Sequence, residues 1–265
     1  KSLENQEFIV YQLYGVTGSG KTEVYLRAAS YAIKKGKSAL FLVPEISLTR
    51  QVVLQVRSRF GLGVAVLHSG LKDAERWREW NRIASGHVNI VVGARSSVFA
   101  PLPNLGLIVV DEEHEPAYKQ EDGMRYNARD VAIVRAKLSK CPVVLGSATP
   151  SLESYAQTQT SKYAALCLPE RVAKRALPRV EIVDLRREVR RGQGTLIFSD
   201  RLAKAIKANH DAQKQTVLFL NRRGYENYLQ CGSCGETLSC PNCSVALTHH
   251  AKRKQLSCHY CGCLI

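Results

Sequence analysis

The stretch Gly15-Val-Thr-Gly-Ser-Gly-Lys-Thr22 decides the fold class of this chain. It matches the phosphate-binding pattern G-x4-G-K-[ST], in which a glycine-rich turn presents backbone N–H groups to phosphate oxygens. The segment before it, Phe8–Leu13, is apolar and β-rich, and the segment after it, Glu23–Lys34, has helical periodicity. This context predicts a strand, a phosphate loop and a helix, and therefore a nucleotide-binding α/β domain.

The run Leu107-Ile-Val-Val-Asp-Glu-Glu-His114 places carboxylates directly after another apolar strand. Open α/β sheets bind their ligands at the carboxyl ends of the strands, so we expect these carboxylates beside the phosphate loop. Phosphoryl transfer to water needs one carboxylate that holds Mg²⁺ and one group that orients or activates the water. Asp111 suits the first role and Glu112 suits the second.

The acidic run has other interpretations when it is taken alone. It is typical of a solvated turn, and two carboxylates with His114 could form a separate metal site, although three adjacent carboxylates cannot all face one ion. Beside a phosphate loop, the run indicates an ATP-hydrolysing site in which Lys21, Asp111 and Glu112 are catalytic. The residues expected to hold ATP and Mg²⁺ are Gly15, Val16, Thr17, Gly18, Ser19, Gly20, Lys21, Thr22 and Asp111.

The composition limits the classes of partner. Across 265 residues, 38 Lys and Arg stand against 23 Asp and Glu, which leaves a net charge of +15. This excess favours nucleic acid ahead of a membrane, although charge dispersed along the chain is also compatible with an ordinary basic surface. No apolar run approaches the ~18 residues of a membrane span and no signal peptide is visible, so we expect a cytoplasmic protein without a membrane partner. The sole methionine is Met124, and we expect the chain to be a piece of a longer protein.

The alternation of apolar and amphipathic segments predicts a parallel sheet covered by helices. The expected strands are Phe8–Leu13, Ser38–Val43, Gly63–Leu67, Asn89–Val92, Leu107–Val110 and Pro142–Leu145. Residues 150–194 are rich in Pro, Gly and basic side chains and indicate a connector, in which Val180–Leu185 could form an edge strand. A helical segment from Phe198 then leads into Thr216–Leu220, whose buried-strand pattern suggests the start of a second α/β domain.

Three C-x2-C pairs near the end of the chain have the spacing of zinc knuckles. A redox C-x-x-C is the alternative for any single pair. Six thiolates do not fill two four-ligand sites, and His249, His250 and His259 are available substitutes that we interpret as surface residues. All-thiolate ligation leaves no open position for water, so the sequence predicts a structural zinc. The candidate ligands are Cys231, Cys234, Cys240, Cys243, Cys258 and Cys261.

In their order and spacing, several motifs resemble those of the superfamily 2 helicases, and within them the primosomal replication-restart helicases. The motifs are Gly15–Tyr25, Leu42-Val-Pro-Glu-Ile-Ser-Leu-Thr49, His68-Ser-Gly-Leu71, Gly93-Ala-Arg-Ser96, Asp111-Glu-Glu-His114, Gly146-Ser-Ala-Thr-Pro-Ser151, Asn221-Arg-Arg-Gly-Tyr225 and the cysteine cluster. The resemblance covers nearly the whole chain. It implies an α/β fold: a RecA-like phosphate-loop domain with a parallel sheet, and the start of a second RecA-like domain with an inserted small zinc-binding module.

The expected domain boundaries follow from this organisation. We expect the ATP-binding helicase domain at residues 1–160, a connector at 161–197, the start of the second domain at 198–230, and a truncated zinc-binding module at 231–265. The resemblance implies that Cys240, Cys243, Cys258 and Cys261 form one zinc site, and that the first cysteine pair is completed beyond Ile265. It also implies that Ser147 and Thr149 couple the nucleotide site to DNA movement through His114, and that Pro44–Thr49 and Gly93–Ser96, with Arg95, hold single-strand phosphates.

Residues 115–130 form a polar segment in which aromatic side chains are interleaved with cations. Such a segment can stack on bases and pair with phosphates, and its place after the acidic run would make DNA contact felt at the ATP site. It resembles the aromatic-rich loop of this family, which usually has a tryptophan where Met124 stands; a mobile surface loop is the alternative. The candidate DNA-contact residues in it are Tyr118, Arg125 and Tyr126, and Lys119 and Arg129 are its further cations.

The resemblance implies an ATP-dependent DNA helicase that moves 3′→5′ at stalled or branched replication forks and restarts replication by primosome assembly. The implied cofactors are ATP, Mg²⁺ and Zn²⁺, and the implied partners are single-stranded and forked DNA, primosome proteins, single-strand-binding protein and the replicative helicase loader. These motors take the arginine that completes the transition state from the second domain, so we expect weak hydrolysis from this chain alone. The alternatives are another superfamily 2 DNA translocase, which would not be expected to carry the cysteine knuckles, and a zinc-ribbon clamp that binds DNA without turnover.

Overall fold

The computed structural model describes residues 2–5, 7–44, 50–172, 178–184, 198–219, 237–243, 246–250, 255–258 and 261–265. The chain divides into two compact units, Lys1–Leu177 and Pro178–Ile265. Each unit is described by itself.

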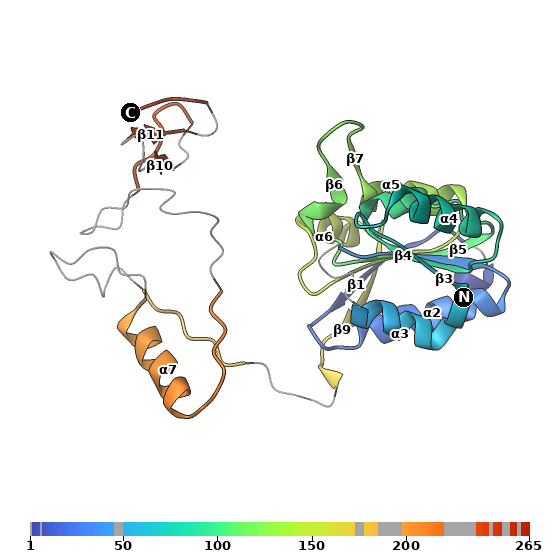
Figure 1. The fold of residues 1–265 in the computed structure, drawn as a ribbon, viewed down its shortest axis with the longest axis horizontal. Helices are drawn as coiled ribbons and strands as arrows, with labels where there is room; N and C mark the ends of the chain where they lie inside the picture. The colour runs from blue at the N-terminus through green and yellow to red at the C-terminus, as the bar shows by residue number, and fades with distance from the viewer. Residues whose placement is uncertain are drawn as a thin grey trace. The chain divides into compact units, whose positions relative to one another are not determined.

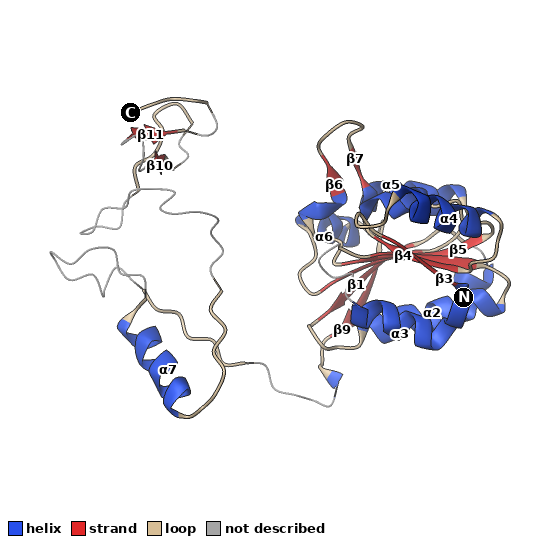
Figure 2. Ribbon diagram, viewed as in Figure 1, coloured by secondary structure: helices blue, strands red, loops and turns tan. Residues whose placement is uncertain are grey.

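The first unit is built on a seven-stranded parallel sheet (Figures 1 and 2). Its strand order is β3-β4-β2-β5-β8-β1-β9, so the strand that leads into the phosphate loop lies near one edge. The strands are β1 (Val10–Gly15), β2 (Ser38–Leu42), β3 (Val64–Leu67), β4 (Ile90–Gly93), β5 (Leu105–Asp111), β8 (Val143–Ser147) and β9 (Ala164–Leu168). The strands expected from the sequence correspond to all of these except β9, which confirms the parallel α/β architecture.

The sheet is covered by helices on both faces (Figure 1). Helices α2 and α3 pack on one face, and α4, α5 and α6 cover the other. The helices are α1 (Ser2–Asn5), α2 (Lys21–Lys34), α3 (Arg50–Phe60), α4 (Asp73–Ala84), α5 (Ala128–Leu138) and α6 (Leu152–Gln159), with short 3-10 turns η2 (Gly61–Gly63), η3 (Arg95–Phe99) and η4 (Pro116–Tyr118). Because both faces are covered, the central strands are buried without interruption: β2 is buried along its whole length, and β5 is buried up to Val110.

The small hairpin β6 (Lys119–Gln120) and β7 (Tyr126–Asn127) lies outside the main sheet, within the polar segment 115–130. It leads directly into α5, whose first turn is capped by the Asn127 side chain accepting from the Arg129 N–H at 3.0 Å. The hairpin is therefore held at the start of a helix that packs on the sheet.

The expected end of the first domain at residue 160 is wrong, because β9 continues the main sheet beyond it. β9 pairs in parallel with β1 from Tyr11–Ala164 to Gly15–Leu168. It is an edge strand with one neighbour, and its middle residues are exposed. An exposed edge strand lacks the continuous burial that marked the central strands, which is why it was assigned to the connector.

The second unit contains one helix and a small antiparallel sheet. Helix α7 (Asp200–Asp211) begins where expected, after Ser199 caps it by accepting from the Leu202 N–H at 3.0 Å. The expected strand at Thr216–Leu220 is not present among residues 214–219, where Val217 and Phe219 are 91% and 85% exposed. Residues 180–184 likewise form no strand. A buried strand needs partners on both sides, and the described residues near this segment supply none.

Strands β10 (Thr248–His250) and β11 (Gln255–Ser257) pair antiparallel beside the cysteine cluster. Cys240, Leu247 and Cys258 are buried together there. The Asn221–Tyr225 motif and the cysteines at 231 and 234 lie outside the described residues. Among the helices that the structure describes, none combines the length and the apolar character required to span a membrane.

Candidate functional site

The phosphate loop lies between the end of β1 at Gly15 and the start of α2 at Lys21. Gly18 and Gly20 have φ values of 81° and 91°, in the left-handed region that glycine adopts without strain. A side chain at Gly15 would meet the Ser19 hydroxyl at 2.5 Å, so the turn also needs glycine there. The Lys21 amino group donates to the Gly15 carbonyl at 2.7 Å and is nearly buried. The loop is thus a compact turn that ends at the N-terminus of a helix, the geometry that binds phosphate.

The chain that leaves β9 returns to this loop. The Val172 N–H donates to the Gly18 carbonyl at 2.9 Å, and the Val172 side chain lies 3.5 Å from the position a Cβ at Gly20 would take. The Leu168 Cβ lies 3.2 Å from the position a Cβ at Gly15 would take. This contact is not predictable from the sequence, because no local pattern relates these connector residues to a loop about 150 residues earlier.

The acidic run follows β5, which is separated from β1 only by β8. Asp111 is the last residue of β5 and accepts a hydrogen bond from the Tyr25 hydroxyl at 3.0 Å, which ties it to α2. Burial and the nearby Asp111 carboxylate raise the pKa of Tyr25, so its hydroxyl stays protonated and donates. The expected proximity of the acidic run and the helix after the phosphate loop is therefore present.

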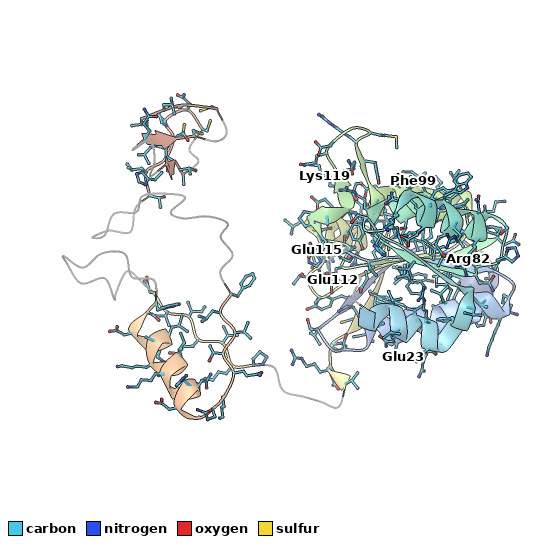
Figure 3. The ribbon with its side chains drawn as sticks, viewed as in Figure 1. Glu23, Arg82, Phe99, Glu112, Glu115 and Lys119 are labelled. Atoms are coloured by element: carbon cyan, nitrogen blue, oxygen red, sulfur yellow. The ribbon has the colours of Figure 1, made fainter. Side chains whose placement is uncertain are left out.

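The environment of these carboxylates suits a cation. Burial raises the pKa of Asp111 above its ordinary value, and burial together with the Asp111 charge raises the pKa of Glu112. A divalent cation held by Asp111 would offset the effect of burial on that carboxylate, and the Asp111 carboxylate with the Thr22 hydroxyl are oxygen donors of the kind that Mg²⁺ prefers. Glu112 has a φ of 47°, an uncommon conformation for a side chain of this kind, which turns the chain sharply after the strand. Figure 3 labels Glu112 and Glu115 on this side of the unit.

His114 lies against the segment that follows β8. Its Nδ1 is 2.8 Å from the Ser147 hydroxyl and 3.7 Å from a Glu112 carboxylate oxygen, and its Nε2 is 3.4 Å from the Thr149 hydroxyl. The Thr149 N–H also donates to the Ser147 hydroxyl at 2.8 Å. The structure therefore brings together the three residues that the resemblance assigned to coupling.

Glu113 faces away from the nucleotide side and was not assigned a role from the sequence. Its carboxylate is fully buried and pairs with Arg129 at 3.1 Å. It accepts from the Ser151 N–H at 2.8 Å and from the Ser154 hydroxyl at 2.9 Å. The sequence does contain one signal for this role. Three adjacent carboxylates cannot all face one ion, so at least one of them turns away, and a buried carboxylate that turns away needs a buried cation as its partner.

The two ends of the aromatic segment contact the rest of the first unit. Tyr118 is 1% exposed, and its hydroxyl donates to the Asp111 carbonyl at 2.7 Å, so it cannot stack on a base and the expected contact at this position is wrong. Tyr126 is half-buried and meets Phe99 edge-to-face, with ring centroids 5.1 Å apart. Arg125 is exposed, and its contact with a phosphate stays a prediction. Figure 3 labels Phe99 and Lys119 near this segment.

The cations of this segment divide into two kinds. The Arg95 guanidinium donates to the carbonyls of Ala117 and Lys119 at 3.3 and 2.7 Å, so it supports the root of the hairpin as well as lying at the surface. Arg129 turns inward to Glu113 and is not available to phosphates, contrary to expectation. A cavity of about 650 Å³ lies beside the hairpin, lined by Lys119, Gln120, Glu121, Arg125, Tyr126, Asn127 and Asp130.

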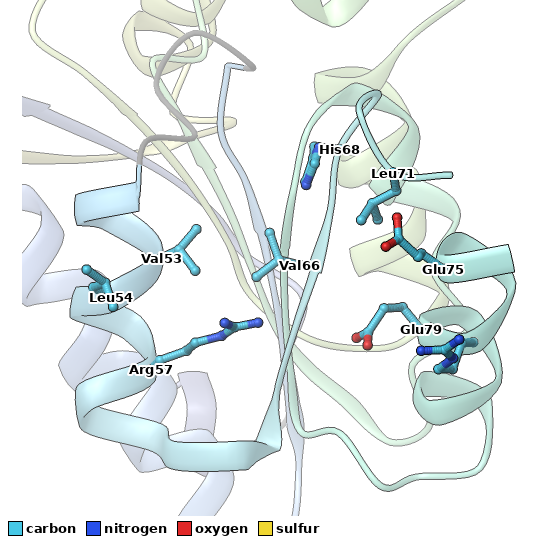
Figure 4. Close-up of a pocket in the computed structure, with 9 residues that line it drawn as sticks. Val53, Leu54, Arg57, Val66, His68, Leu71, Glu75 and Glu79 are labelled. Carbon is cyan, nitrogen blue, oxygen red and sulfur yellow. The ribbon is translucent and has the colours of Figure 1, made fainter. Parts of the chain in front are cut away.

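A second cavity, of about 670 Å³, lies between α3 and α4 along the edge strand β3 (Figure 4). Val53, Val66 and Leu71 give it apolar walls, and Arg57 and Glu79 extend toward it from the two helices. None of its lining residues belongs to the phosphate loop or to the acidic run, so it is not the nucleotide site.

The cysteine cluster has the geometry of a four-thiolate site. The ligand atoms of Cys240, Cys243, Cys258 and Cys261 all lie within 4.8 Å of one another, and the sulfurs of Cys240 and Cys261 are 3.6 Å apart. A tetrahedral zinc with Zn–S bonds of about 2.3 Å places its sulfurs about 3.8 Å apart, so the four residues fit Zn²⁺. His249 and Cys263 are not members of this cluster.

Comparisons with known proteins agree with this geometry. A family model described as DEAD/DEAH box helicase matches residues 3–158, and the chain belongs to that family. A second model, described as the PriA DNA helicase Cys-rich region (CRR) domain, matches residues 240–263. The helicase assignment and the phosphate-loop fold with a cysteine-rich module, both expected from the sequence, are confirmed.

The more particular similarity is to replication restart protein PriA. The chain is 50% identical to that of Bacillus subtilis (strain 168) over 262 residues, which are 99% of this chain and 32% of the relative. It is 45% identical to that of Chlamydia pneumoniae over 98% of this chain and 35% of the relative, and 48% identical to that of Treponema pallidum (strain Nichols) over 95% and 37%. The chain thus spans about a third of the length of these curated relatives.

Proposed function

We propose that this chain carries the ATP-binding motor domain and part of the zinc module of a DNA helicase that restarts replication at stalled or branched forks. The observation that carries the proposal is that the phosphate loop, the acidic run and the Ser147–Thr149 segment follow the neighbouring parallel strands β1, β5 and β8. Asp111 is bonded to Tyr25 of the helix after the loop, and His114 of the acidic run contacts the hydroxyls of Ser147 and Thr149. The proposal includes movement 3′→5′ along single strands and a cytoplasmic site of action. It also includes three kinds of partner: primosome proteins, single-strand-binding protein and the helicase loader. The similarity to replication restart proteins supports them.

The chemistry assigned to the site is hydrolysis of ATP. ATP bound with Mg²⁺ supplies the phosphoryl group that is transferred to water. Lys21 would leave the Gly15 carbonyl to meet the β- and γ-phosphates, and Thr22 and Asp111 would hold the metal ion. Glu112, held beside His114, orients the attacking water and accepts its proton.

Contact between the nucleotide site and DNA would run through His114. When the nucleotide site changes, Glu112 moves relative to His114, and the bonds from His114 to Ser147 and Thr149 carry the change into the segment before α6. Coupling between two binding sites is reciprocal. DNA held near that segment would therefore alter nucleotide affinity by the same factor by which the nucleotide alters DNA affinity.

The test is ATP turnover by the parent chain of which these residues are a part, with and without single-stranded or forked DNA. We expect strong stimulation by DNA, and loss of turnover by about 100-fold or more in Lys21→Ala, because the phosphate charge loses its fixed cation. Lys34→Ala, at the exposed end of the same helix, is the matched control and should behave like wild type. Strand displacement on forks with a 3′ or a 5′ single-stranded tail measures direction.

Two outcomes would overturn parts of the proposal. DNA binding without turnover would replace the motor with an ATP-sensitive clamp. Turnover without any preference for forked DNA over plain single strands would leave a DNA translocase and remove the restart function.

A further inference from the structure

The carboxylate of Glu113 is the centre of a buried polar network that no step of the proposed reaction uses. It is fully buried, and it receives hydrogen bonds from Arg129, from the Ser151 N–H and hydroxyl, and from Ser154. Arg129 also donates to the Ser151 hydroxyl at 2.9 Å, which closes the network. A buried carboxylate with this many donors is fully satisfied, so its position is fixed closely.

The network joins three segments that are distant in the sequence. Glu113 follows the catalytic carboxylates by one residue. Arg129 lies in the first turn of α5, directly after the hairpin β6–β7. Ser151 is the N-cap of α6 and follows Thr149 by two residues. One carboxylate therefore connects the acidic run, the root of the hairpin and the segment that contacts His114.

The other root of the hairpin is also anchored at the acidic run. The Tyr118 hydroxyl donates to the Asp111 carbonyl at 2.7 Å, just before β6 begins at Lys119. The hairpin is thus flanked by two anchoring side chains: Tyr118, before β6, bonds to Asp111, and Arg129, after β7, bonds to Glu113. A displacement of the hairpin would act on the backbone of the acidic run from both sides.

The two anchors differ in what they can transmit. The Tyr118 bond goes to a backbone carbonyl and depends on one hydroxyl. The Glu113–Arg129 bond goes to a charged carboxylate that in turn receives the Ser151 N–H, so it reaches α6 as well. Separating a buried charge from its partner costs free energy. We therefore expect Glu113 and Arg129 to stay paired when either of them moves.

We propose that Glu113 and Arg129 are positioning residues that link the hairpin to the nucleotide site, so that DNA bound at the hairpin sets the rate of ATP turnover. The inference rests on the proposed helicase function and deepens it, because it assigns the link to a buried ion pair at the base of the hairpin. Neither residue touches ATP or water in this assignment.

The test compares two arginines on the same helix. Arg129→Lys keeps the charge but cannot reach Glu113, Ser151 and Asp130 together, as the guanidinium does. Arg135→Lys is the matched control, because Arg135 is also partly buried on α5 but donates to the carbonyls of Val98 and Ala100 and not to the acidic run. Both variants are made in the parent chain. Turnover is measured without DNA and at saturating single-stranded DNA, and thermal melting is measured for both.

We expect Arg129→Lys to lower the ratio of DNA-stimulated to basal turnover by about fivefold or more, with the basal rate changed much less. Arg135→Lys should keep the wild-type ratio of DNA-stimulated to basal turnover, even if its melting temperature falls as far as that of Arg129→Lys. Glu113→Gln should lower the ratio in the same way, and the double variant Glu113→Gln with Arg129→Lys should be no worse than the more severe single variant.

A purely structural role predicts a different result and would sink the inference: basal and stimulated rates fall in proportion, or both lysine variants lower the ratio equally. The affinity of a fluorescent ATP analogue with and without DNA gives a second readout that does not need turnover, and Arg129→Lys should remove the effect of DNA on it. If DNA stimulates turnover by the wild type and stimulates Arg129→Lys to the same extent, the proposed link is rejected and the helicase function is kept. A wild type that shows no DNA effect on turnover or on affinity would reject both.

Discussion

Among single residues, Glu112 has the most specific environment in the nucleotide site. It adopts a left-handed backbone conformation directly after β5, and its carboxylate lies 3.7 Å from His114. Burial and the adjacent Asp111 charge raise its pKa. The role assigned to it requires the ionised form, because a protonated carboxyl cannot accept a proton from water.

We expect turnover by the parent chain to fall as the pH is lowered through a pKa that lies above the ordinary 4.5 of a glutamate. The sign follows from the raised pKa, because the carboxylate is lost at a higher pH than in an exposed glutamate. Glu112→Gln should lower turnover by about 100-fold and remove this acidic limb while nucleotide binding is kept. The measurement is a pH profile of kcat with binding of a nucleotide analogue.

Glu115→Gln is the control for this profile. Glu115 is the next carboxylate but one, and its charge raises the pKa of Glu112 slightly, so the variant should turn over normally with its acidic limb at slightly lower pH. An acidic limb that survives in Glu112→Gln would show that another group is titrating.

Residue-level prediction succeeded where chemistry is local and failed where it is long-range. The phosphate loop could be assigned from its own sequence, because the spacing of its glycines fixes the turn. The partners of Glu113 could not, since Arg129, Ser151 and Ser154 are 16, 38 and 41 residues away and only the fold brings them together. For the same reason, Tyr118 was expected at the surface although its side chain fills the core.

Among the elements, the antiparallel pair β10 and β11 depends most on something other than burial. Its core contains only Cys240, Leu247 and Cys258 as buried members of the described cluster. A segment of this size cannot bury enough apolar surface to stay folded, so metal binding supplies most of its stability.

We expect removal of zinc by a chelator to unfold this element without lowering the melting temperature of the nucleotide-binding unit. Cys240→Ser should reduce the zinc content of the parent chain by about one ion, because a four-thiolate site loses a ligand. Cys263→Ser is the matched control, since Cys263 lies beside the cluster but is not one of its ligands. Zinc analysis together with melting in the presence of ATP and Mg²⁺ measures both effects. Equal zinc loss in the two variants would contradict the ligand assignment.

The strands show which elements a sequence can specify. β2 and β5 are buried between neighbours on both sides, so their apolar character is continuous and was recognised. β9 is an exposed edge strand, and the segment 216–219 is apolar but exposed and unpaired as a strand in the described residues. Apolar composition therefore predicted a strand correctly only where the neighbouring strands were also present.

For the whole molecule, the division after Leu177 separates nucleotide binding from the cysteine module. Every residue assigned to ATP and Mg²⁺ lies in the first unit, as do both partners of the Glu113–Arg129 pair. A unit with its own sheet and its own buried core can fold independently.

We expect residues 1–177, produced alone, to fold and to bind ATP·Mg²⁺ with an affinity within about threefold of the parent chain, and to hydrolyse it slowly. The reason is that the phosphate contacts are local to this unit, whereas the arginine that completes the transition state in such motors is supplied by another domain. Calorimetric titration with ATP·Mg²⁺ measures binding, and Lys21→Ala in the same piece is the control. Failure to bind, or turnover equal to that of the parent chain, would contradict this division.

The hydrogen bond from the Val172 N–H to the Gly18 carbonyl connects the chain that leaves the first sheet to the phosphate loop. A force applied to the chain at Val172 would therefore act on the phosphate loop through this bond as well as on the pairing of β9 with β1.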